Sequence, residues 1–144
     1  MTTRVSTLAA CVALVATAPP AAGQHMNAQD AACRDVVGTS DATACLSGAL
    51  ASRDRELAQT LDKIRSAVVG NELGLLNRSQ AVWAEYRRLS CDAEYAMYGG
   101  GTGGPVTRLA CMVALTRDRA KQLHDAYDWR VEKHKWTVEH PNGR

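Results

Sequence analysis

The sequence predicts an all-α protein: a small antiparallel helical bundle of three long helices plus a short N-terminal helix, stapled by disulfides. Two observations predict helices. Apolar residues recur at intervals of three, four and seven positions, which is the spacing of one helical face. No segment shows the sustained period-two alternation of a half-buried strand. A chain of 144 residues is long enough for one such domain with short appendages.

Residues 1–23 have the features of a secretory signal peptide. Arg4 supplies a positive charge, an apolar run covers residues 8–18, and small residues precede a cleavage point before Gln24. The run is too short to span a bilayer, which needs about 20 residues. We therefore expect a mature chain that is periplasmic or secreted, without a transmembrane segment.

An alternative for the leader is a lipoprotein signal. The stretch Leu8-Ala9-Ala10-Cys11 resembles a bacterial lipobox, in which Cys11 would become the lipid-anchored N-terminus. The apolar run continues past Cys11 to Val15, however, whereas a lipoprotein signal ends its apolar core before the cysteine. Anchoring through Cys11 stays open as the second interpretation.

Four cysteines follow the leader: Cys33, Cys45, Cys91 and Cys111. They are 12, 46 and 20 residues apart, with no Cys-x-x-Cys pair and no nearby histidine, so two disulfides are favoured over a zinc site. Cys91 and Cys111 lie on either side of a glycine-rich loop, and Cys33 and Cys45 flank a turn at Gly38. This placement favours Cys33–Cys45 and Cys91–Cys111, with crossed pairings still open because all four lie near one end.

The helical domain is expected over residues 24–128. A short helix is predicted at 27–37, and long helices at 45–69, 72–97 and 106–128, with glycines breaking the chain between 98 and 105. Residues 129–144 are mainly polar, carry Trp129 and Trp136, and are expected to form a frayed C-terminal tail.

Polar residues occupy positions on the apolar helix faces, beside the predicted core residue Trp83. They are Asp54, Gln80, Arg87, Glu94, Thr116 and Arg119. Burying an unpaired charge is costly, so buried arginines require partners. One interpretation is a structural network in which Asp54 and Glu94 pair with Arg87 and Arg119. The other is a polar cleft that binds a ligand, for which the same Arg–carboxylate geometry serves.

Several functional classes do not fit the sequence. A net charge of +2 without a clustered basic face argues against nucleic-acid binding. Asp92 and Glu94 are two apart on one helix and point in different directions, unlike a glycosidase pair. The glycines lack the strand and the Lys-Ser/Thr of a phosphate loop. We therefore expect no catalytic residues, no metal and no cofactor.

One motif in the third predicted helix resembles a known family. The run Gln80-Ala-Val-Trp83-Ala-Glu-Tyr86-Arg87, followed by Cys91 and Glu94, resembles the Gln-x-x-Trp-x-x-aromatic-Arg…Cys-x-x-Glu signature of the LprI-like lysozyme-inhibitor N-terminal domains, which are small exported bacterial proteins. The resemblance covers about residues 27–128. Two features depart from it: Arg88 stands where the family often has Asp, and the loop is unusually rich in glycine. The family supplies no catalytic residues.

The resemblance implies inhibition of a lysozyme-type muramidase or a related cell-wall hydrolase. The candidate contact residues near the glycine loop are Tyr98, Thr102, Asp92 and Glu85. Removal of residues 1–23 leaves a net charge of +1, so complementarity to a basic lysozyme would have to be local. The alternative is an envelope structural or interaction module without an enzyme target. The sequence does not predict an oligomeric state.

Overall fold

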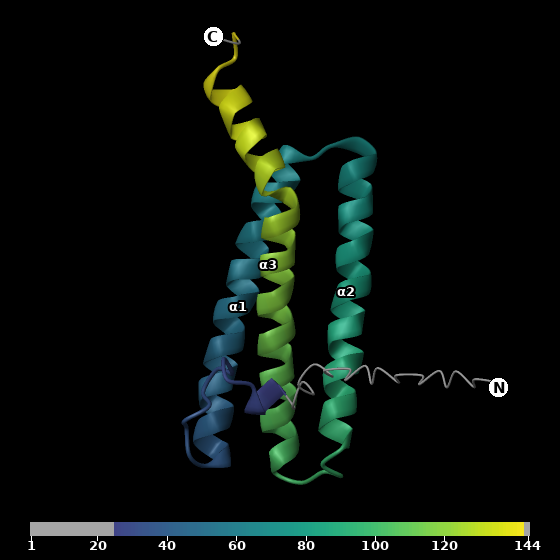
Figure 1. Cartoon of the computed structure of the whole chain (residues 1–144). Coiled ribbons are helices and arrows are strands. Elements are labelled where there is room, and N and C mark those ends of the chain that lie inside the picture. The colour runs from purple at the N-terminus through teal and green to yellow at the C-terminus, as the bar shows by residue number, and fades with distance from the viewer. Residues whose placement is uncertain (1–24, 143–144) are drawn as a thin grey trace, which may run out of the picture.

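The computed structural model describes residues 25–142 and confirms the predicted all-α class. After a short 3-10 turn, η1 (His25–Asn27), come three long helices: α1 (Thr39–Ala67), α2 (Gly70–Ala96) and α3 (Gly103–Glu139) (Figure 1). They run alternately up and down. The expected signal peptide and the alternative anchor Cys11 lie outside the described residues.

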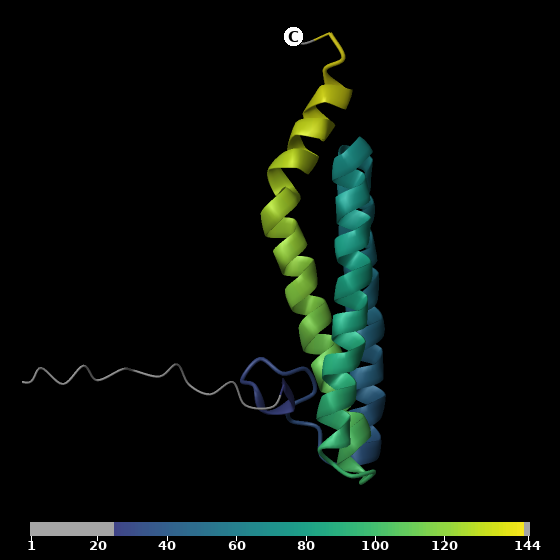
Figure 2. The same ribbon diagram turned by 90° about the vertical axis from the view of Figure 1, so that its right-hand side faces the viewer.

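Helix α3 is the element on which both other long helices pack. It contacts α1 and α2 along its length, whereas α1 and α2 contact each other very little. The C-terminal end of α3 projects beyond the turn that joins α1 to α2 (Figures 1 and 2). At that turn Val68 and Val69 adopt extended backbone conformations; Val68 is buried and fixes the turn on the core, while Val69 is exposed.

The apolar core consists of two separate clusters. The cluster near the α1–α2 turn contains Leu57, Leu61, Ile64, Val68, Leu76, Ala120 and Leu123, with half-buried Trp83 packed on it. The cluster near the α2–α3 loop contains Leu46, Val106, Ala110 and Val113, with Met26 and Ala32 of the N-terminal segment packed on it. Polar side chains occupy the level between the two clusters.

Both predicted disulfides are confirmed. Cys33 is bonded to Cys45, and Cys91 to Cys111, with Cα atoms 6.1 and 5.5 Å apart. Cys91 and Cys111 are fully buried and join α2 to α3. Cys33 and Cys45 are more accessible and join the N-terminal segment to the start of α1.

The predicted helix at residues 27–37 is wrong, because this segment forms turns after η1. Its tertiary contacts override its helical propensity: Cys33 has φ 60° and is tied to Cys45, and Met26 packs on the core. Helix propensity alone does not predict such tertiary contacts.

The predicted end of the last helix at 128 is also wrong, because α3 continues to Glu139. The first residues after 128 contact the rest of the bundle: Val131 packs on the core, and Arg130 Nη2 lies 3.1 Å from Glu72 Oε2 on α2. Trp129 and Trp136 are exposed on the projecting part.

The glycine-rich segment contributes to packing as well as to the turn. Helix α3 begins at Gly103, earlier than predicted, and two tyrosine rings occupy the space beside its first turn. A Cβ atom at Gly103 would lie 2.9 Å from the ring of Tyr98, and one at Gly104 would lie 2.9 Å from the ring of Tyr95. Only glycine permits this close approach between the loop, α2 and α3.

Replacing the buried pair Cys91 and Cys111 by alanine is expected to lower the free energy of unfolding by about 2–5 kcal/mol. The loss combines release of the loop in the unfolded chain with a cavity in the core. Urea denaturation of the oxidised protein measures it. The matched control replaces Cys33 and Cys45, which are less buried, and should lose about 1 kcal/mol less. An equal or larger loss in the control would contradict this ranking.

Candidate functional site

One arginine joins all three long helices at the level between the two core clusters. Arg87 Nη1 on α2 donates to Asp54 Oδ1 on α1 and to Thr116 Oγ1 on α3, at 2.7 Å in each case. Thr116 is fully buried and its hydroxyl donates to the Met112 carbonyl at 2.6 Å. The guanidinium is mostly buried, while Asp54 stays partly in solvent.

Trp83 lies close to this arginine and to a second one. The guanidinium carbons of Arg87 and Arg119 are 5.0 and 5.8 Å from the centre of the indole, within the range of cation–π attraction. Arg119 Nε donates to Gln80 Oε1 at 3.1 Å, and its Nη1 donates to Gln122 at 2.8 Å. Burial lowers the pKa of Arg119, but an arginine so placed remains charged at neutral pH.

Glu94 does not pair with an arginine, so that part of the predicted network is wrong. Its Oε1 lies 2.7 Å from His25 Nδ1, which joins α2 to the N-terminal segment. The turns of that segment bring His25 back over the bundle, a placement that helical periodicity could not predict.

His25, Glu94 and Cys111 bring three potential metal ligands within 4.8 Å of one another. The Cys111 sulfur is bonded to Cys91, so it offers no thiolate. Two ligands remain, fewer than a structural metal site uses.

The geometry of Arg87 and Arg119 favours the structural network over the ligand-binding cleft. Both guanidinium groups direct donors at side chains of the protein itself and lie close to Trp83. These internal contacts favour a structural role.

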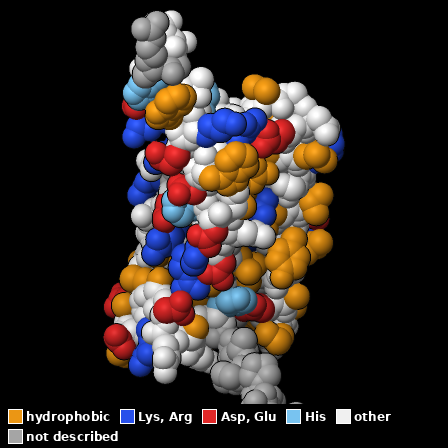
Figure 3. All heavy atoms as spheres, turned by 45° about the horizontal axis from the view of Figure 1, so that its top comes forward, with side chains coloured by type: hydrophobic (Ala, Val, Ile, Leu, Met, Phe, Trp, Pro, Cys, Tyr) orange, Lys and Arg blue, Asp and Glu red, His pale blue; other side chains and the backbone are white. Residues whose placement is uncertain are grey.

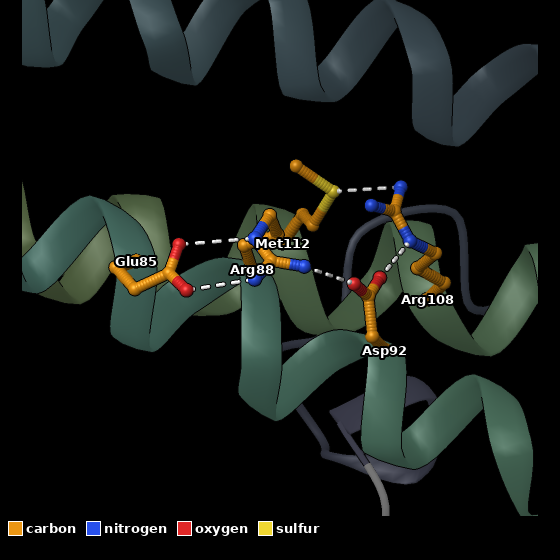
Figure 4. A network of polar contacts seen from close by, with 5 residues as sticks. All are labelled: Glu85, Arg88, Asp92, Arg108 and Met112. Carbon is orange, nitrogen blue, oxygen red and sulfur yellow. Dashed lines mark hydrogen bonds and ion pairs between the residues drawn. The ribbon is translucent and has the colours of Figure 1, made fainter.

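The two acidic contact candidates belong to a surface chain of ion pairs (Figure 4). Arg88 lies between Glu85 and Asp92 on α2, with nitrogen–oxygen distances of 2.7 and 3.2 Å. Asp92 also accepts from Arg108 Nε of α3 at 2.7 Å. Hydrogen bonds from Arg88 and Arg108 hold the pKa values of Glu85 and Asp92, respectively, below their ordinary values.

The other two contact candidates lie in the α2–α3 loop. Tyr98 is half-buried, its ring packs against Gly103, and its hydroxyl lies 3.6 Å from Met26 Sδ. Thr102 is exposed at the start of α3. The structure therefore turns the aromatic ring inward and leaves Thr102 at the surface.

The interactions of three residues in these clusters were not predicted from the sequence. Arg88 lies three and four positions from Glu85 and Asp92, and that spacing was a readable sign of helix-surface ion pairs. Arg108 and His25 reach their partners through tertiary structure alone.

The fold and these clusters define a small disulfide-stapled helical protein whose polar core residues serve architecture. None of the described helices has an apolar stretch long enough to cross a membrane. Residues 24–123 match the family model described as Lysozyme inhibitor LprI, and the chain belongs to that family. No curated protein and no solved structure matches the chain.

Replacing Arg87 by alanine is expected to lower the free energy of unfolding by about 2–3 kcal/mol. The substitution removes two charge-assisted hydrogen bonds and the cation–π contact with Trp83. The control is Arg88→Ala, one position along the same helix, where loss of surface ion pairs costs about 0.5 kcal/mol or less. Chemical denaturation followed by tryptophan fluorescence compares the two. Similar losses in both variants would rule out a special role for Arg87.

Asp92 should make stability depend on acid pH. Because its pKa in the folded state is below the ordinary value of 3.8, the unfolded chain takes up a proton first as pH falls. The stabilisation is complete above that value and is lost as pH drops through the folded pKa. Asp92→Asn should therefore lose less stability than the wild type between pH 6 and pH 3, as measured by urea midpoints. An identical loss in both proteins would contradict this assignment.

Proposed function

We propose that the mature protein is an exported inhibitor of lysozyme or of a related cell-wall hydrolase. Membership of the LprI family over residues 24–123 is the observation that carries the proposal. The protein would act by occupying the sugar-binding cleft of the hydrolase and not by chemistry of its own.

The α2–α3 end of the bundle is the surface that we propose enters the cleft. Residues 99–102 are exposed at this end, where the chain turns from α2 into α3 (Figure 1). Cys91–Cys111 and the packing of Tyr98 and Tyr95 on the first turn of α3 fix the loop from behind. A preorganised loop loses little conformational entropy on binding, which favours affinity.

Local charge at this end is balanced, not strongly acidic. Glu85 and Asp92 already share Arg88 and Arg108, so neither is a free anion for a basic hydrolase. Recognition would then depend on the shape of the loop and on backbone hydrogen bonds more than on net attraction, in keeping with the net charge of +1 for residues 24–144.

A turbidity assay of muramidase action on cell walls, with excess mature protein, tests the proposal. We expect the clearing rate to fall at micromolar inhibitor. Thr102→Arg should weaken inhibition at least about tenfold, because it adds bulk and positive charge to the loop that enters the cleft. Asn71→Arg is the matched control: it makes the same charge change at the opposite end of the bundle and should inhibit like the wild type.

Unchanged muramidase activity at excess wild-type protein would reject inhibition of that enzyme. Recovery of a non-hydrolase partner from envelope extract, with muramidase unaffected, would favour the alternative of an envelope interaction module. Equal inhibition by Thr102→Arg and Asn71→Arg would show that a different surface carries the contact.

A further inference from the structure

Helix α2 carries a row of exposed side chains, and the fold does not use the apolar ones among them. The one polar member, Ser79, donates to the Leu76 carbonyl and accepts from Arg119 Nη2. Leu75, Val82, Tyr86 and Leu89 are 53%, 71%, 56% and 52% exposed, and exposed Ser79 and Ala93 complete the row. We call this set the α2 stripe. Its successive spacings of four, three, four, three and four residues are those of the seam of a helix pair.

The α2 stripe lies beside the surface that α2 buries on its own bundle. Core contacts of α2 come from Leu76, Trp83 and Cys91, and each of these follows a stripe residue by one or two positions. Figure 3 shows hydrophobic side chains gathered along the right-hand edge of the molecule, over α2. Neither the core nor the loop end accounts for this second apolar surface.

Tyr86 stands out because it belongs to the Gln80–Arg87 motif. In that motif Gln80, Trp83 and Arg87 are all used by the polar layer or by the core. The ring of Tyr86 projects into solvent instead, at the middle of the α2 stripe.

We propose that the α2 stripe binds the α2 stripe of a second copy of this chain, with the two helices antiparallel. With the two-fold axis near residue 84, Val82 of one copy faces Tyr86 of the other. In the same alignment Leu75 faces Ala93, and Ser79 faces Leu89. Each large side chain away from the axis thus meets a small one, which lets two identical helices approach closely.

Charges beside the stripe support the antiparallel alignment. Arg78, Glu85 and Asp92 form the column along one edge of the seam, and such columns face each other in antiparallel helix pairs. Arg78 of one copy then lies beside Asp92 of the other, twice in the dimer. Arg78 has no ion-pair partner among the described residues, and a carboxylate can accept more hydrogen bonds than Arg88 and Arg108 supply to Asp92.

The two Glu85 side chains that face each other near the two-fold axis are compatible with this arrangement. Glu85 meets Glu85 of the second copy, but each carboxylate is already neutralised by Arg88 of its own helix through two contacts of 2.7 and 3.0 Å. Only the antiparallel form brings the two columns together, so the Arg78–Asp92 pairs favour it.

Sedimentation equilibrium of the mature chain, residues 24–144, tests self-association. We expect dimers at about 100 µM protein, and Val82→Glu should weaken dimerisation at least about tenfold. Val82 is exposed, so the substitution leaves the fold intact, which circular dichroism and thermal melting can verify. The control Val37→Glu makes the same change at a side chain that is 89% exposed outside the stripe, and it should dimerise normally.

Cross-linking of single-cysteine variants tests the alignment. Glu85→Cys lies next to the axis and should form disulfide-linked dimers under mild oxidation. Met97→Cys lies 13 positions from the axis, so its two copies would be about 40 Å apart and should not cross-link. Cross-linking of Met97→Cys would overturn the antiparallel alignment.

A wild-type chain that remains monomeric at about 100 µM would overturn the proposal itself. Equal weakening by Val82→Glu and Val37→Glu would show that the copies associate through another surface and would overturn it also. Binding of the monomer to vesicles of anionic lipid, abolished by Val82→Glu, would assign the stripe to a membrane surface in place of a second copy.

Discussion

The architecture depends on the burial of one guanidinium group. Apolar clusters alone tolerate sliding of helices along one another, because leucine against leucine is favourable at several registers. Arg87 removes that freedom: a shift of one helical turn, about 5.4 Å, would take it out of reach of both Asp54 and Thr116. A buried charge without partners is strongly unfavourable, so the three helices are held at one relative height. Trp83, within cation–π distance of Arg87 and Arg119, extends the same constraint to the neighbouring turn.

This arrangement separates the part of the protein that maintains the fold from the part available for recognition. The polar residues that first suggested a binding cleft are used between helices, and Glu94 ties down the N-terminal segment through His25. Two surfaces remain accessible. One is the end of the bundle with the α2–α3 loop, which the Cys91–Cys111 disulfide holds in place, and the other is the exposed side of α2. The two surfaces are distinct, so one could bind a target while the other is covered.

Much of the fold could be predicted from the sequence because its signals are local. Leucine spacing predicts three helices, so the fold class follows from the sequence. Two cysteine pairs flank two turns, which favoured the observed disulfide pairing over the crossed ones. Glu94 and His25 could not be matched, since an irregular segment brings them together across the chain. The continuation of α3 past 128 was missed because Val131 and Arg130 find partners on the bundle that a polar composition does not reveal. Tyr86 belongs to the same motif as Trp83, and the sequence did not predict that Tyr86 is exposed.

Both disulfides join cysteines that are consecutive among the four in the described residues. A chain that emerges N-terminus first presents Cys33 and Cys45 together, before Cys91 appears, and then Cys91 with Cys111. An oxidase that joins thiols in their order of arrival therefore produces the native pairing directly, with no later exchange between wrong partners. The native pairing therefore coincides with the order in which synthesis presents the cysteines.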